Sequence, residues 1–261
     1  MKNNFHTHTY RCHHATGTDE EYVKSAIAAK IRVLGFSDHT PWPFKGEYRP
    51  SVRMDITQLD SYLYSITSLR ERFSNEIDIK VGLECEYFEK FIPWLSDMSE
   101  EKKLDYLIFG NHFPTGDLDA EYFGHSAVNK EHMDYYCETA LRGMEFNKFA
   151  YFAHPDLFMR AYPEFDKVCE NVSRKICEKA AKLNLPLEFN ISGYQMSKDR
   201  NIKCYPHTKF WEIAADCNCS CIIGFDAHKN SALEQTNTWN RALATIHKLG
   251  LKRIDSFEFL Q

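Results

Sequence analysis

The stretch DITQLDSYLYSITSLRERFSNEIDIKVGLE, residues 55–84, contains one complete helix–strand unit and decides the fold class. Apolar residues recur every three or four positions over residues 55–73, which predicts a helix with one buried face. The run IDIKVGLE, residues 77–84, then has the β-rich, apolar character of a strand buried in a sheet. This strand ends on a carboxylate, Glu84, which is an unusual residue to place at the end of an apolar segment.

The same alternation of strand and helix recurs along the whole chain. Strands are expected at residues 3–7, 32–37, 77–84, 104–110, 148–154, 187–190 and 220–226. Helices are expected after a capping box formed by Thr18 and Glu21, and over residues 55–73, 129–146, 166–183, 207–216 and 231–248. Strict alternation over 261 residues favours a closed parallel barrel over an open sheet. We therefore predict an α/β fold, a distorted (β/α)7 TIM-like barrel with parallel strands and outer helices, in a single domain over residues 1–261.

The composition limits the classes of partner. The net charge is −5, with no cluster of lysine and arginine, which argues against a nucleic-acid partner. No run approaches the about 18 apolar residues of a membrane span, and the start MKNN lacks the apolar core of a signal peptide, so we expect a cytoplasmic protein. None of the nine cysteines forms a C-x-x-C pair, which makes a zinc ribbon improbable.

Polar residues of the metal-ligand type stand at the carboxyl ends of the expected strands. They are His6, His8, Asp38, His39, Glu84, His112, His154, Asn190, Asp226 and His228. In a parallel barrel these ends share one rim, where residues distant in sequence converge. A single histidine of this kind is usually a hydrogen-bonded core residue, but agreement among six strands indicates a shared metal site.

The ligand types limit the metal and the number of ions. Imidazoles with carboxylates and no thiolate suit zinc, iron or manganese, whereas magnesium prefers an almost all-oxygen site. Seven histidines with Glu84 and Asp226 exceed the three or four protein ligands of one ion, so at least two ions are implied and three would use every ligand. The segment FHTHTYRCHH, residues 5–14, leaves two adjacent candidates, His13 and His14, for one of these ligands.

The segments HTHTYRCHH, VGLECEY, GNH, AHPD, LEFNISG and GFDAH together resemble, in order and spacing, the PHP superfamily of polymerase and histidinol phosphatase domains. The resemblance covers essentially the whole chain and is strongest to the histidinol-phosphate phosphatase branch. It implies a trinuclear centre with Glu84 as a bridging ligand, and it favours His14 over His13. The implied ligand sets are His6, His8, Glu84 and Asp226 at one metal, Glu84, His112 and His154 at a second, and His14, His39 and His228 at a third.

The resemblance also implies the activity, which is hydrolysis of L-histidinol phosphate to L-histidinol and phosphate by a metal-bridging hydroxide. The catalytic residues would be Glu84, Asp226 and His228. Three alternatives stay open: a PHP-type phosphatase for another small phosphomonoester, a PHP-type nuclease, and a metal-binding module without catalysis. The negative net charge counts against the nuclease, and the full ligand set counts against the module.

Substrate contacts are expected from residues in the loops beyond the strands. Arg160 is a candidate phosphate ligand because a guanidinium matches phosphate oxygens in a forked geometry. Relatives often place an arginine soon after the N-x-S-G segment, but here Gln195 stands near that place and Arg200 lies further along as a possible replacement. The wall facing a cationic alcohol would draw on Glu86, Tyr87, Phe113 and Tyr194. Asp38 is expected either to orient a ligand histidine or, as an acid at the end of a strand, to bond backbone amides.

Overall fold

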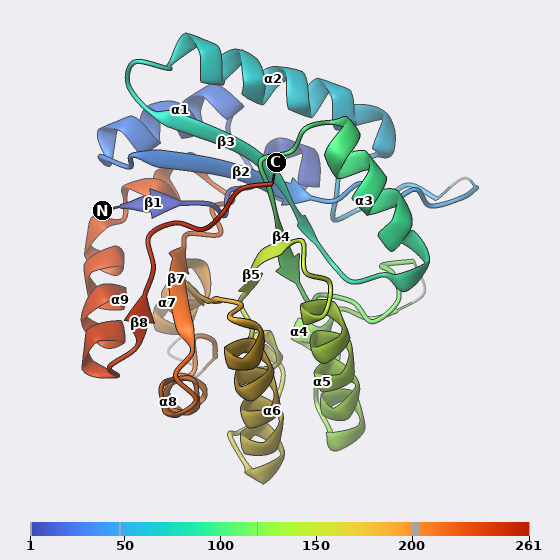
Figure 1. The fold of residues 1–261 in the computed structure, drawn as a ribbon, viewed down its shortest axis with the longest axis vertical. Coiled ribbons are helices and arrows are strands. Elements are labelled where there is room, and N and C mark those ends of the chain that lie inside the picture. Colours follow the sequence, from blue (N-terminus) through green and yellow to red (C-terminus); the bar gives the residue numbers. More distant parts are fainter. Residues whose placement is uncertain (1, 47, 119, 200–203, 261) are drawn as a thin grey trace.

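In the computed structural model, which describes residues 2–46, 48–118, 120–199 and 204–260, eight parallel strands pair in chain order (Figure 1). They are β1 (Asn3–Asn4), β2 (Val33–His39), β3 (Asp78–Cys85), β4 (Tyr106–Gly110), β5 (Phe149–Ala153), β6 (Leu187–Asn190), β7 (Ser220–Gly224) and β8 (Lys252–Arg253). The seven expected strands are all present in a TIM-like arrangement. The predicted number of seven was wrong by one, because β8 is a two-residue strand too short to carry a hydrophobic pattern.

Helices surround the curled sheet on its outside (Figure 1). They are α1 (Asp19–Ala28), α2 (Leu59–Arg72), α3 (Ile92–Glu101), α4 (Phe123–Ser126), α5 (Lys130–Met144), α6 (Lys167–Leu183), α7 (Ile191–Asp199), α8 (Thr208–Asp216) and α9 (Thr236–Lys248). The Thr18 capping box is confirmed, since Thr18 and Glu21 each bond the other's backbone N–H. The sequence pattern did not indicate α3, α4 or α7; in α3, Pro93 lies in the first turn, where proline needs no donor partner.

Hydrogen bonds join the chain after β1 to the chain after β7, so the curled sheet is tied across its two sides. His8 N donates to Ala227 O at 3.0 Å, and Ala227 N donates to His6 O at 3.2 Å. The buried side chain of Asn4 reinforces the junction, because its Oδ1 accepts from Phe225 N at 2.9 Å. These bonds hold the first and last ligand-bearing segments of the chain together.

The register of the sheet aligns the ligand-bearing strand ends. His39 at the end of β2 pairs with Glu84 of β3, and Gly110 of β4 pairs with Ala153 of β5, which directly precedes His154. Asn190 of β6 pairs with Gly224, two residues before Asp226. The predicted convergence of strand ends at one rim is therefore built into the backbone pairing.

The opposite end of the barrel is filled by aromatic residues and covered by the C-terminal segment. Along β4, Tyr106 and Ile108 face the barrel interior, whereas Leu107 and Phe109 join the larger core formed with the helices. Phe257 packs against this interior, with ring centroids 4.6 Å from Phe5, 5.5 Å from Tyr106 and 5.7 Å from Tyr151. In Figure 1 the dark red C-terminal segment accordingly crosses from β8 toward the start of β4, where Leu260 N donates to Asp105 O at 2.8 Å. None of the helices in the described parts of the chain combines the length and apolar character needed to cross a membrane.

Replacing Phe257 with alanine should lower the free energy of unfolding by about 2 kcal/mol, because the substitution removes a half-buried ring and its aromatic contacts. Urea unfolding followed by circular dichroism measures the change. Tyr64→Ala, at a side chain on α2 that is 76% exposed, is the control and should change stability by no more than about 0.5 kcal/mol. Equal stability of Phe257→Ala and the wild type would show that the C-terminal segment does not support the barrel.

Candidate metal centre

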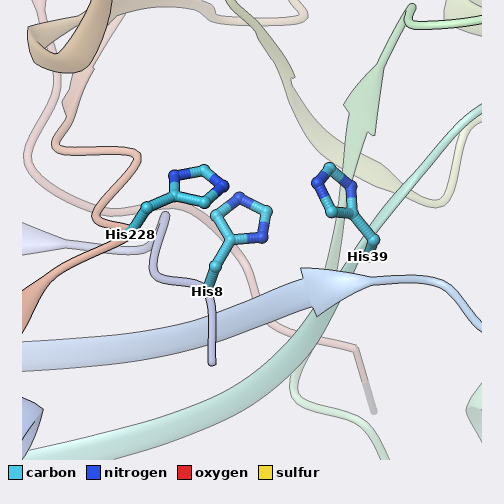
Figure 2. A group of neighbouring side chains, drawn as sticks. All are labelled: His8, His39 and His228. Carbon is cyan, nitrogen blue, oxygen red and sulfur yellow. The ribbon is translucent and has the colours of Figure 1, made fainter. Parts of the chain in front are cut away.

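The predicted ligands converge at the carboxyl-terminal rim of the sheet. His6 and His8 are fully buried beneath the rim. Above them lies a cleft of about 650 Å³, and seven of the predicted ligands line it: His14, His39, Glu84, His112, His154, Asp226 and His228. Figure 2 shows His8, His39 and His228 approaching one another from three segments that are far apart in the sequence.

Glu84 lies at the centre of the cluster. Its Oε1 is 2.9 Å from His154 Nε2 and 3.3 Å from His112 Nε2. Its Oε2 faces three more ring nitrogens at 3.2–3.4 Å, those of His6, His8 and His39. Burial disfavours the charged form, but the surrounding imidazoles hold the pKa of Glu84 well below its usual range. One ionised carboxylate therefore contacts five histidines.

Asp226 closes the opposite side of the cluster. Its Oδ1 lies 3.3 Å from His8 Nε2 and 3.5 Å from His6 Nε2, and its Oδ2 accepts from Asn190 Nδ2 at 3.2 Å. Burial opposes ionisation, but neighbouring imidazoles, with His6 the largest contributor, hold the pKa of Asp226 well below its usual range. Asp226 and His154 both adopt the left-handed backbone region, with φ of 50° and 33°, which is costly for residues other than glycine and is concentrated at functional sites.

The Nε2 atoms of His14 and His228 face each other in a geometry that favours a bound cation. Each ring donates its Nδ1 hydrogen to a backbone carbonyl: His14 to Cys12 O at 2.7 Å and His228 to Asp226 O at 3.1 Å. Carbonyls only accept, so in the neutral rings both Nε2 atoms carry lone pairs, yet they lie 3.0 Å apart. Burial and the nearby His8 lower the pKa of both rings, that of His228 to about 3, so the rings stay neutral. A bound cation would relieve the repulsion between the two lone pairs.

His6 and His8 form a second pair of facing rings; burial opposes their charge, but the neighbouring carboxylates raise the pKa of both. His6 Nδ1 donates to the Glu188 carboxylate at 2.8 Å, and His8 Nδ1 lies 3.4 Å from Asp38 Oδ1. These partners direct the Nε2 atoms of the two rings toward each other at 3.1 Å. Asp38 also accepts from the backbone N–H of His39 at 2.8 Å, so it serves both of the roles considered for it in the sequence.

His112 and His154 form a third pair of facing rings, with Nε2 atoms 3.3 Å apart. His112 Nδ1 donates to Glu86 Oε1 at 3.0 Å, which directs its Nε2 into the cluster. Burial opposes the charge on Glu86, but Arg53 and His112 lower its pKa to about 2. Glu86 is therefore an ionised acceptor that holds a ligand histidine.

The donor set fits divalent metal ions. In the described parts of the chain, Glu84 Oε2 and His39 Nδ1 are buried and have no hydrogen-bond partner. Three groups of side chains place one ligand atom each within 4.8 Å of the others: His6, His8 and Asp226; His6, Glu84 and His154; and His8, His39 and His228. Lone pairs of imidazole and carboxylate directed into one space, with the outer ring nitrogens held by acceptors, are typical of metal sites.

The candidate substrate residues have different outcomes. Arg160 and Phe113 both line the cleft, and the Arg160 guanidinium lies 5.6 Å from the centre of the Tyr122 ring. Arg200 lies outside the described residues. His14 is the member of the His13–His14 pair whose ring meets His228, whereas His13 ends a short 3-10 turn in the left-handed backbone region, with φ of 68°.

Sequence reasoning missed Glu188. This residue is fully buried on β6 and accepts from His6 Nδ1, from His154 N at 3.1 Å and from Asn190 Nδ2 at 2.9 Å. The available signal was an acidic residue inside a strand two positions before Asn190, on the same face. Gly224 of the neighbouring strand makes room for it, since a Cβ there would collide with the Glu188 carboxylate.

Comparison with known proteins agrees with this geometry. A family model described as PHP domain matches residues 4–192. A probable histidinol-phosphatase of Deinococcus radiodurans is 29% identical over 235 residues, which span 86% of this chain and 85% of that protein. A histidinol phosphate phosphatase from Lactococcus lactis, solved in complex with zinc, L-histidinol and phosphate, has a TM-score of 0.76 at 20% identity, with 100% of this chain and 99% of that one covered. A second solved structure, the putative histidinol phosphatase of Listeria monocytogenes, has a TM-score of 0.73 at 20% identity and covers 91% of this chain and 99% of its own.

Replacing Glu188 with glutamine should weaken metal binding by about 10- to 100-fold, because the amide leaves one of the three donors around it without an acceptor and loosens His6. Competition with a chromogenic chelator measures the affinity. Glu101→Gln, at a side chain on α3 that is 74% exposed, is the matched control and should bind metal as the wild type does. Unchanged affinity in Glu188→Gln would exclude Glu188 as a support of the centre.

Proposed function

Because the chain belongs to the PHP domain family, we propose that it is a metal-dependent phosphomonoesterase that hydrolyses L-histidinol phosphate to L-histidinol and phosphate. The observation that carries this proposal is the convergence of histidines and carboxylates on Glu84 at the base of a cleft that also contains Arg160. The names of the relatives in Deinococcus radiodurans and Lactococcus lactis support the choice of substrate.

The centre holds two to three divalent ions of zinc, manganese or iron. The ligands divide into His6, His8, Glu84 and Asp226 for one ion, Glu84, His112 and His154 for a second, and His14, His39 and His228 for a third. Glu84 serves two of these sets because its two oxygens face different histidines. When bound, the ions supply Lewis acidity toward the phosphoryl oxygens and toward water.

The chain's own residues bind and orient the reactants. Arg160, which lines the cleft, binds phosphate oxygens, and Phe113 supplies apolar surface for the alcohol. We assign Glu84, Asp226 and His228 as catalytic residues because they would hold ions that supply Lewis acidity toward the phosphate ester. Asp226, whose pKa is lowered, stays ionised and accepts a hydrogen bond from the attacking water.

The wider assignment follows from the same residues. We place residues 1–261 in one PHP domain, because Asp226 and His228 lie beyond the matched residues 4–192 yet complete the ligand set. The protein acts in the cytoplasm on a small phosphorylated substrate. A nuclease is disfavoured by the net charge of −5.

Phosphate release by the manganese- or zinc-loaded protein tests the proposal. The substrates are L-histidinol phosphate, a panel of other small phosphomonoesters and a short single-stranded oligonucleotide. We expect kcat/KM for L-histidinol phosphate to exceed that for the other esters by at least about 100-fold, because a cleft built for one alcohol discriminates through differential transition-state binding. Glu84→Gln, purified in the same way, controls for contaminating phosphatases.

Weak and even hydrolysis across the panel would reject L-histidinol phosphate as the substrate while keeping the phosphatase activity. Cleavage of the oligonucleotide in preference to the esters would support the nuclease instead.

A further inference from the structure

A buried charged cluster stands beside the metal centre on the wall of the cleft, formed by Arg53, Glu86 and Asp117. The Arg53 side chain is 1% exposed, Glu86 is 1% exposed and Asp117 is 3% exposed. Arg53 bonds Glu86 through both terminal nitrogens, at 3.1 and 2.9 Å, and its Nε donates to Asp117 Oδ2 at 3.0 Å. One guanidinium is therefore shared by two carboxylates.

The two carboxylates differ in whether an oxygen atom is left without a hydrogen-bond partner. Both oxygens of Glu86 are fully engaged: Oε1 accepts from Arg53 and from His112 Nδ1, and Oε2 accepts from Arg53 and from Trp42 Nε1 at 2.8 Å. Asp117 Oδ1 is buried and has no hydrogen-bond partner within residues 2–46, 48–118, 120–199 and 204–260. An unpartnered, buried carboxylate oxygen is costly, so its presence on a cleft wall points to a cation that arrives with the ligand.

The rest of the cleft differs from this wall in the sign of its charge. A metal centre and Arg160 provide the positive charge that phosphate needs, whereas the wall at Asp117 carries one negative charge in excess. A phosphate ester with an ammonium group on its alcohol has the matching pattern, with an anionic end and a cationic end. A neutral alcohol would leave Asp117 Oδ1 without a hydrogen-bond partner in the complex.

We propose that Asp117 is the residue that selects the cationic alcohol, by accepting a hydrogen bond from the substrate's ammonium group at Oδ1. This inference rests on the proposed phosphatase function and assigns the amine-recognising part of its cleft. Arg53 positions Asp117 and stops its carboxylate from turning away. Charge-assisted hydrogen bonds of this kind are strong enough to set specificity by one to two orders of magnitude.

The test compares Asp117→Asn with the wild type on two esters, L-histidinol phosphate and its deamino analogue, in which hydrogen replaces the amino group. We expect the preference for the amine-bearing ester, as a ratio of kcat/KM values, to fall by at least about tenfold in Asp117→Asn. Asp117→Glu, which keeps the charge, should retain most of the preference. Asp105→Asn is the matched control, because it removes another aspartate paired with an arginine, Arg70, at the far end of the barrel.

Equal losses on both esters, which leave the ratio unchanged, would overturn the proposal and assign Asp117 a purely structural role. Unchanged kcat/KM values on both esters would overturn it too and would place amine recognition elsewhere. If Asp117→Asn does not fold, calorimetric binding to the wild type decides: L-histidinol should bind at least about tenfold more tightly than its deamino counterpart, and equal affinities would refute the proposal. This binding measurement also separates the two hypotheses. A wild type that hydrolyses no phosphomonoester but binds L-histidinol through its amine would reject the phosphatase function and retain the role of Asp117.

Discussion

The structure depends on one electrostatic constraint, which is that the ring nitrogens of three histidine pairs face one another across about 3 Å around a single carboxylate. His14 faces His228, His6 faces His8 and His112 faces His154, and Glu84 contacts members of all but the first pair. In the neutral rings of His14 and His228, the facing lone pairs repel each other unless a cation lies between them. The energetic cost is met by the barrel core, and the arrangement becomes favourable when positive charge enters the cluster.

The fold fixes this arrangement through strand register and through hydrogen bonds on the sides of the rings that face away from the cluster. Strand register brings His39 beside Glu84, and the bonds between the segments after β1 and β7 bring His8 toward Asp226. Acceptors outside the cluster then fix the rotation of the rings: Glu188 for His6, Asp38 for His8 and Glu86 for His112. Glu86 is itself held by Arg53, so the network that orients a ligand continues into the wall that would receive the substrate.

The sequence predicted the elements that carry a strong pattern. Apolar runs that end in or closely precede His, Glu, Asn or Asp located seven of the eight strands, and parallel topology placed their ends at one rim. Residues whose role depends on side-chain contacts between distant parts of the chain could not be predicted from the sequence. Glu188 looked like one polar residue in a short strand, and the pairing of Arg53 with Asp117 joins positions 64 residues apart. The strand β8 and the helix α7 were missed because neither has a distinctive periodic pattern.

The most direct test of the central claim is the number of divalent ions that each chain retains. Elemental analysis after metal loading and exhaustive dialysis against metal-free buffer gives this number. The facing ring nitrogens and the shared carboxylate predict two to three ions per chain, because one ion cannot contact all three histidine pairs. Retention of one ion or none would contradict the account and would require another explanation for the convergence of histidines on Glu84.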